Sequence, residues 1–223
     1  MRVLVYVEGP GDKVALGSLF RTIIDQGNKS RVGISFHPMR GKSEILKQLG
    51  LKAANHLKSN PEDYIFALPD LYPMAEYDHT EFPHRSFEQL KGHLVERFHK
   101  QADQFQLAEE VRSHYRVHCL KHDLEVLLLG TPEVLRQRLK TEDGIEKNWR
   151  RPVEDQNDKE PPKRVVERLF MKYRKHRYSE TTDAPWILER AVPRIRELCD
   201  ACPQHFRPLF TELDRLSRGE PLD

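Results

Sequence analysis

Short apolar runs alternate with longer segments of helical periodicity over the first 130 residues of the chain. The runs at 3–7, 32–39, 64–69 and 115–120 have the length and residue types of buried strands. The segments between them repeat apolar residues every three or four positions, as amphipathic helices do. Strands that alternate with helices favour an α/β fold with a mainly parallel, four-stranded sheet, because parallel neighbours need a helical crossover.

The expected helices begin at capping residues and end at turn residues. Asp12 is predicted to cap a helix that runs to about Gln26, and Ser43 to cap the next one. Ser86 begins a third, and Thr131 begins a helix with proline in its first turn. A short, mostly buried helix is expected over 122–129.

The last third of the chain shows helical patterns only. Helices are expected at about 163–176, 184–200 and 204–217, after a polar, exposed loop between Thr141 and Pro162. We therefore expect an α/β domain at 1–130 and a helical extension at 131–223, packed together as a single structural unit.

Acidic residues stand where three of the four strand-like runs stop. Glu8 follows the first run, Asp70 the third, and Asp123 and Glu125 the fourth. The carboxyl ends of neighbouring strands form the usual ligand site of an open α/β sheet. Carboxylates that gather there repel one another unless a cation joins them, and hard oxygen ligands suit Mg²⁺ or Mn²⁺.

Each of these groups also has a structural alternative. Glu8 could cap a turn and Asp70 a loop, each satisfied by backbone amides. His122 could act as a general acid or orient a ligand, or could only hydrogen-bond a carbonyl at the helix start. Gly9-Pro10-Gly11 lacks the lysine of a P-loop, so a tight turn that lets Glu8 face the site is expected there.

The charge is nearly balanced overall but is uneven along the chain. The chain of 223 residues has 37 basic and 35 acidic residues. Between 163 and 177, seven lysines and arginines stand against one acid, Glu167. A helix here is predicted to contact nucleic acid phosphates or an acidic protein partner. The predicted contact residues are Lys163, Arg164, Arg168, Lys172 and Lys175.

The sequence favours a cytoplasmic protein without membrane spans. No apolar stretch approaches the roughly 20 residues that cross a bilayer. Three cysteines cannot all pair, and the Cys199 and Cys202 thiols are expected to be inert, because no second ligand pair at zinc spacing accompanies them.

Several motifs in their order resemble the Toprim-like proteins, and in particular the DUF4276 family. The early ones are Val7-Glu8-Gly9, Asp70-Leu71-Tyr72 and the stretch 122–128, whose usual family form is His-Glu-Phe-Glu-Ala-Leu-Leu. The later ones are Pro162-Lys163-Arg164, Tyr173-Arg174-Lys175 and Cys202-Pro203-Gln204-His205-Phe206. The resemblance thus spans almost the whole chain.

The resemblance implies metal-dependent phosphodiester chemistry, as in Toprim nucleases of the OLD type and of phage defence. It implies that Glu8 and Asp70 bind Mg²⁺, with Asp123 or Glu125 completing the site. The chain departs from the usual pattern in two places. Tyr72 stands where a second aspartate is usual, and Asp123 replaces a glutamate.

Three functions follow as hypotheses. The first is a Mg²⁺-dependent nuclease for DNA or RNA, an effector linked to an AAA- or ABC-type ATPase in anti-phage defence, with Glu8, Asp70, Glu125 and His122 as catalytic residues. The second is a non-catalytic subunit that binds nucleic acid or a partner within such an ATPase complex, which the missing aspartate favours. The third is a hydrolase of a small phosphate substrate.

Overall fold

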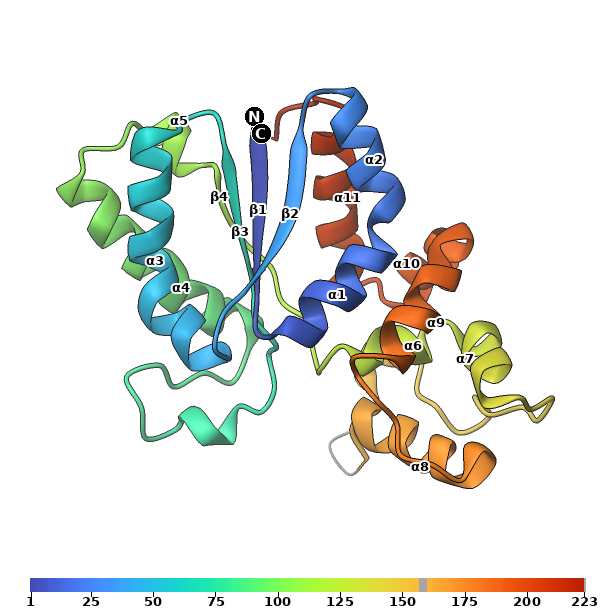
Figure 1. The fold of residues 1–223 in the computed structure, drawn as a ribbon. Helices are drawn as coiled ribbons and strands as arrows, with labels where there is room; N and C mark the ends of the chain where they lie inside the picture. The colour runs from blue at the N-terminus through green and yellow to red at the C-terminus, as the bar shows by residue number, and fades with distance from the viewer. Residues whose placement is uncertain (157–159, 223) are drawn as a thin grey trace.

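The computed structural model describes residues 1–156 and 160–222, and its centre is a four-stranded sheet (Figure 1). All strand pairs are parallel, and the strand order is β2-β1-β3-β4. The strands are β1 (Arg2–Val7), β2 (Gly33–Pro38), β3 (Tyr64–Leu68) and β4 (Tyr115–Val117). The expected α/β class with a parallel four-stranded sheet is therefore confirmed.

Helices cover both faces of the sheet (Figure 1). One face packs against α1 (Pro10–Leu19), α2 (Arg21–Lys29) and α11 (Phe206–Ser217), and the other against α3 (Lys42–Ser59) and α4 (Phe87–Gln104). The remaining helices are α5 (Glu109–Arg112), α6 (Glu125–Leu129), α7 (Pro132–Leu139), α8 (Pro162–Arg174), α9 (Asp183–Ala191) and α10 (Ile195–Ala201). Short 3₁₀ turns lie at Ala75–Tyr77, Val153–Asp155 and Val192–Arg194.

The apolar core has one part on each face of the sheet. Every residue of β3 is buried, as expected for a central strand covered on both faces. Val5 belongs to the same buried cluster as Leu188 of α9 and Phe206 of α11. The helical extension therefore shares its core with the sheet. None of the described helices combines the length and hydropathy needed to cross a lipid bilayer.

The first predicted helix is in fact two helices, so that prediction was wrong in detail. α1 begins at Pro10 rather than at Asp12, and the chain bends at Phe20 before α2 begins. The bend lets the Phe20 ring pack against Phe36 and Phe206, with ring centroids 5.6 and 5.9 Å apart. Tertiary packing of one aromatic side chain thus overrides continuous helical periodicity.

Two other helix boundaries also differ from the predictions. α3 begins at Lys42, one residue before Ser43, because Gly41 takes a φ of +86° that favours glycine. α7 begins at Pro132 with Thr131 at its cap position, as predicted, but the Thr131 hydroxyl forms no capping bond and lies 3.4 and 3.3 Å from the carbonyls of Leu127 and Leu128. The helix expected over 184–200 is interrupted at Pro193, which has no N–H to continue the hydrogen-bond series. Ser86 does cap α4 as predicted, accepting the Gln89 N–H at 3.3 Å.

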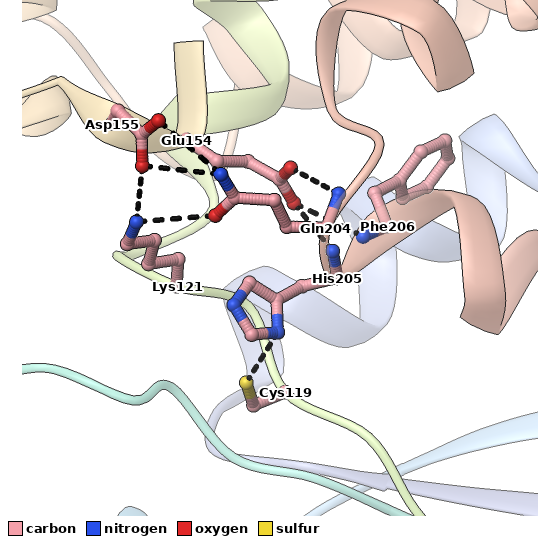
Figure 2. Close-up of polar contacts among 7 residues, drawn as sticks. All are labelled: Cys119, Lys121, Glu154, Asp155, Gln204, His205 and Phe206. Carbon is pink, nitrogen blue, oxygen red and sulfur yellow. Dashed lines mark hydrogen bonds and ion pairs between the residues drawn. The ribbon is translucent and has the colours of Figure 1, made fainter. Parts of the chain in front are cut away.

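The loop predicted to be exposed between Thr141 and Pro162 contains a buried anchor instead. Glu154 is 1% exposed, and its carboxylate accepts the N–H groups of Gln204, His205 and Phe206 at 2.6, 2.8 and 3.2 Å (Figure 2). Those amides lie at the amino terminus of α11, where an anion is favoured by the helix dipole. The loop is thereby fixed to α11, the helix that packs against α2 and lies beside β4.

Candidate functional site

The sheet order places Glu8 and Asp70 at the switch point between neighbouring strands. The chain leaves β1 toward β2 on one side and returns to β3 on the other, so a crevice opens beyond the carboxyl ends of β1 and β3. Val7 pairs with Leu68 in register, and the next residues of each strand enter this crevice. Asp70 also bridges to Leu120 beyond β4.

The structure brings the predicted acids together at this crevice. A cavity of about 350 Å³ is lined by Glu8, Asp70, Tyr72, Pro73, His122, Asp123 and Pro161. Glu125 lies in the first turn of the buried helix α6 and is 1% exposed. The Glu8 carboxylate accepts the Asp70 N–H at 2.9 Å, so the backbone-satisfying role considered for Glu8 is also present.

The carboxylates raise one another's pKa values. Burial, followed by the charges of Glu8 and other acids of the cleft, raises the pKa of Asp70 well above its usual range. Burial raises the pKa of Asp123 to about 6. Burial and the Asp123 charge raise the pKa of Glu125 to about 8. The cleft is therefore short of positive charge, which is the condition that favours a bound cation.

Two carboxylate oxygens of this group are buried without a hydrogen bond of good geometry, although the Glu125 carboxyl lies close enough to lower the pKa of Asp123 as a hydrogen-bond partner. They are Oδ1 of Asp123 and Oε1 of Glu125. The hydroxyl of Tyr178 lies near Glu125 and affects its pKa, but it is also without a hydrogen bond of good geometry. An unsatisfied buried oxygen costs about 1–3 kcal/mol of stability. A bound group beside these two oxygens, such as a cation, would offset that cost.

Two lysines that were not predicted as part of the cleft supply its nearest positive charges. Lys42, the first residue of α3, is buried, and its Nζ donates to the Leu71 carbonyl at 2.7 Å. Burial lowers the pKa of Lys42 to about 8, against the opposing effect of the Glu8 and Asp70 charges. Lys163, predicted to contact nucleic acid, forms an ion pair with Glu180 instead.

Lys163 also belongs electrostatically to the acidic cleft. Burial lowers the pKa of Lys163, but the hydrogen bond to Glu180 and the charges of Glu125 and Asp123 outweigh burial and raise it overall. Asp12, predicted only as a helix cap, interacts with the charges of Lys163 and Glu180 as well. Its Oδ2 accepts the Gly9 N–H at 2.9 Å. Burial raises the pKa of Asp12 as well.

The donors of this cleft suit a hard divalent cation, although their present positions do not form a complete shell. Within residues 1–156 and 160–222, no three His, Cys, Asp or Glu side chains converge as a metal site. Carboxylate oxygens are the donors that Mg²⁺ and Mn²⁺ prefer, and two of them are unsatisfied. The chemistry of the donor set therefore fits the ion, and side-chain rotation has to complete the geometry.

An aromatic pair forms one wall of the cavity. Tyr72 occupies the place of the missing second aspartate, and its ring stacks on the His122 ring with centroids 4.7 Å apart and planes 20° apart. His122 is buried at the end of the loop after β4. It lies in the cleft, as its candidate role requires, with its ring held against Tyr72.

The predicted basic face of α8 is partly neutralised by neighbouring acids. Arg164 pairs with Glu167 at 2.9 Å and Arg168 with Glu160 at 2.6 Å. Lys172 donates to the Tyr173 hydroxyl at 2.7 Å. Lys175 follows the end of the helix with a φ of +59° and is exposed.

One of the comparisons with known proteins identifies the family. No curated protein matches the chain. Among solved structures, the chain is similar to the C-terminal region of the OLD protein of Xanthomonas campestris pv. campestris, with 17% identity, a TM-score of 0.43, and coverage of 97% of this chain and 93% of that one. A family model described as "Domain of unknown function (DUF4276)" matches residues 7–214. Since that match spans most of its length, the chain belongs to the DUF4276 family.

Proposed function

We propose that this protein is a Mg²⁺- or Mn²⁺-dependent nuclease that cleaves phosphodiester bonds of DNA or RNA. One observation carries the proposal: acids that follow β1, β3 and β4 meet at one cleft, where two buried carboxylate oxygens lack a hydrogen bond of good geometry. Buried like charges with raised pKa values are uncommon outside functional sites. The resemblance of the motifs to Toprim-like proteins favours phosphodiester chemistry over other metal-assisted reactions.

In this proposal, Glu8, Asp70, Asp123 and Glu125 hold the metal. When bound, a divalent ion supplies positive charge for the phosphate oxygens and makes a neighbouring water more acidic. Glu125, whose pKa is about 8, is suited to exchange a proton near neutral pH. His122 has its ring orientation fixed by Tyr72 and orients groups at the mouth of the cleft.

Stability and metal binding should both depend on pH through Glu125. Its folded pKa of about 8 exceeds the ordinary value of 4.5, so the folded protein holds a proton that the unfolded chain has lost. Without metal, stability should therefore fall as the pH rises from about 4.5 to about 8. Thermal melting across this range should show a shallower fall for Glu125→Gln, and Mn²⁺ should raise the melting temperature of the parent most at the alkaline end. Equal slopes for the two proteins would contradict the assignment.

The outer face of α8 is the proposed nucleic acid contact. Lys172 and Lys175 are exposed, and Lys172 has only a long ion pair of 4.0 Å with Asp143. Arg164 and Arg168 would first have to exchange their closer acidic partners for phosphates. Each of Lys172→Ala and Lys175→Ala should lower the dependence of log affinity on log salt concentration by about one. Anisotropy of a labelled oligonucleotide across a KCl series measures this. Lys29→Ala, at the exposed end of α2, is the matched control, and slopes equal to its slope would exclude this face.

A non-catalytic role in an ATPase complex is the second candidate, and a specific observation favours it. Tyr72 replaces an acid, and among the described side chains no three are placed as metal ligands. Calorimetric titration with Mn²⁺ separates the two proposals, because a catalytic cleft should bind the ion through Glu8 and Asp70. An effector arm in a cytoplasmic, ATPase-linked defence system remains the proposed setting for either role, with 1–130 and 131–223 acting as a single unit.

A further inference from the structure

The outer edge of β4 forms the floor of a groove that is separate from the acidic cleft. The cavity has a volume of about 410 Å³, and five consecutive residues, 115–119, line it. β4 is the last strand of the sheet, and among the described residues no strand pairs with its outer side. The groove follows the strand for about 16 Å, at roughly 3.3 Å for each of five residues.

Backbone hydrogen bonds show which groups face this groove. His114 O accepts the Ile65 N–H at 3.0 Å, and the His118 N–H donates to Ala67 O at 2.9 Å. Even-numbered residues of this segment therefore pair with β3. In a parallel ladder the alternate residues point the other way, so the amides and carbonyls of Tyr115, Val117 and Cys119 face the groove.

Two helices wall the groove on either side. One residue from each turn of α4 lines the first wall, and residues at the start of α11 and along it line the second. These residues are Phe87, Lys91, Val95 and His99, and His205, Pro208 and Glu212. At one end of the groove the His205 ring lies against Cys119, with Nδ1 3.2 Å from Sγ (Figure 2). The strand edge is thus recessed between side chains.

The opposite edge of the sheet, formed by β2, does not offer a full row of outward N–H groups. The Gly33 N–H donates to Met1 O and the Met39 N–H to Val7 O, so odd-numbered residues of β2 pair inward. Ile34, Phe36 and Pro38 consequently face outward, and Pro38 has no N–H to offer a further strand. Proline is a common protection of exposed edges. On β4, all three outward residues keep their N–H groups.

We propose that β4 accepts an extended segment of a partner protein as a fifth strand of the sheet. Only an extended backbone can satisfy alternate amides and carbonyls along a strand edge. A second copy of this chain is a poor occupant, because its β4 is equally recessed and the helix walls of the two copies would collide. This inference is independent of the proposed nuclease activity, since it uses no residue of the acidic cleft.

The charges of the groove specify the partner segment further. Lys91, Arg112 and Arg116 line it together with two acids, Glu109 and Glu212. Glu212 is already bound to His118 at 2.9 Å, and Lys91 is exposed and forms no ion pair within the part of the chain described. The partner segment should therefore alternate apolar and polar residues and carry an acidic residue that reaches Lys91.

Selection from a displayed library of short random peptides on the full-length protein tests the proposal. The enriched peptides should show the alternating pattern with an acidic residue. One of them, labelled with fluorescein, should bind Lys91→Glu at least about tenfold more weakly than the parent. Lys100→Glu, a charge reversal on the same helix outside the groove, should bind as the parent does. Hydrogen exchange should slow at least about tenfold at the amides of 115, 117 and 119.

Several results would overturn the proposal. Enrichment of no sequence, or of helical amphipathic sequences, would show that the strand edge is not a docking site. A peptide that leaves the exchange of the three outward amides unchanged, or that slows exchange in β2 instead, would place binding elsewhere. Equal affinity for the parent and Lys91→Glu would remove the assigned role of the charge.

Discussion

Glu8→Gln and Asp70→Asn should each reduce metal-dependent cleavage of nucleic acid by at least about a hundredfold while the protein remains folded. Both substitutions keep the size of the side chain and remove a charge at the carboxyl edge of the sheet. The Asp70 N–H can still donate to the amide oxygen of Gln at position 8, so the hydrogen bond between the loops after β1 and β3 should be retained. Loss of activity would then report on charge and metal binding rather than on folding.

The two variants should also melt at temperatures no lower than the parent in the absence of metal. Burial and like charges raise the pKa of Asp70, so an uncharged amide relieves repulsion that the parent retains. Mn²⁺ should stabilise the parent and not the variants. Asp25→Asn, on the exposed surface of α2, is the matched control and should cut and bind Mn²⁺ as the parent does. Full activity in Glu8→Gln and Asp70→Asn would end the nuclease proposal at this cleft.

The sheet and the meeting of its acids were predictable because both depend on local patterns. Apolar runs of strand length locate the strands in the sequence, and the carboxyl ends of parallel strands lie at one edge of the sheet. Glu8, Asp70 and Asp123 follow directly from that rule, since each stands within a few residues of the end of a predicted strand-like run. Membership of the DUF4276 family, expected from the order of the motifs, is confirmed.

The cations of the cleft could not be predicted in the same way. Lys42 reaches Glu8 and Asp70 only because its Nζ meets the Leu71 carbonyl in the loop after β3, and no periodicity specifies that path. Its place directly after the turn at Gly41, beyond β2, was the one available signal. Lys163 and Glu180 belong to the helical extension and act on the acids of the cleft through their charges, so their roles depend on how distant segments pack.

In the helical extension, too, a contact important for stability could not be predicted from the sequence. Helical periodicity located the helices near α8, α9 and α11, but composition alone assigned the segment before them to an exposed loop. A single buried carboxylate, Glu154, contradicts that assignment by binding the amides of residues 204–206 (Figure 2). These hydrogen bonds join residues about fifty positions apart and fix the loop to α11. Local periodicity and composition do not report contacts at that separation, so the sequence could not predict them.

Glu154→Ala should be the most destabilising of the substitutions considered, by about 3 kcal/mol. Three amides at the start of α11 would lose their acceptor in a buried place, and a favourable charge at a helix amino terminus would disappear. For a chain of this size, the melting temperature should fall by about 6 to 12 °C. Thermal denaturation followed by circular dichroism measures the change.

Asp155→Ala is the matched control for this prediction. Asp155 is the next residue, and its carboxylate pairs with Lys121 and the Gln204 side chain at a half-exposed position (Figure 2). Ion pairs at such positions contribute at most about 1 kcal/mol, so its loss should lower the melting temperature by only a few degrees. Glu154→Gln, which keeps an acceptor oxygen but no charge, should fall between the two. If Glu154→Ala and Asp155→Ala melted together, burial of the Glu154 carboxylate would not be what fixes α11, and the helix would have to be stabilised by its apolar face alone.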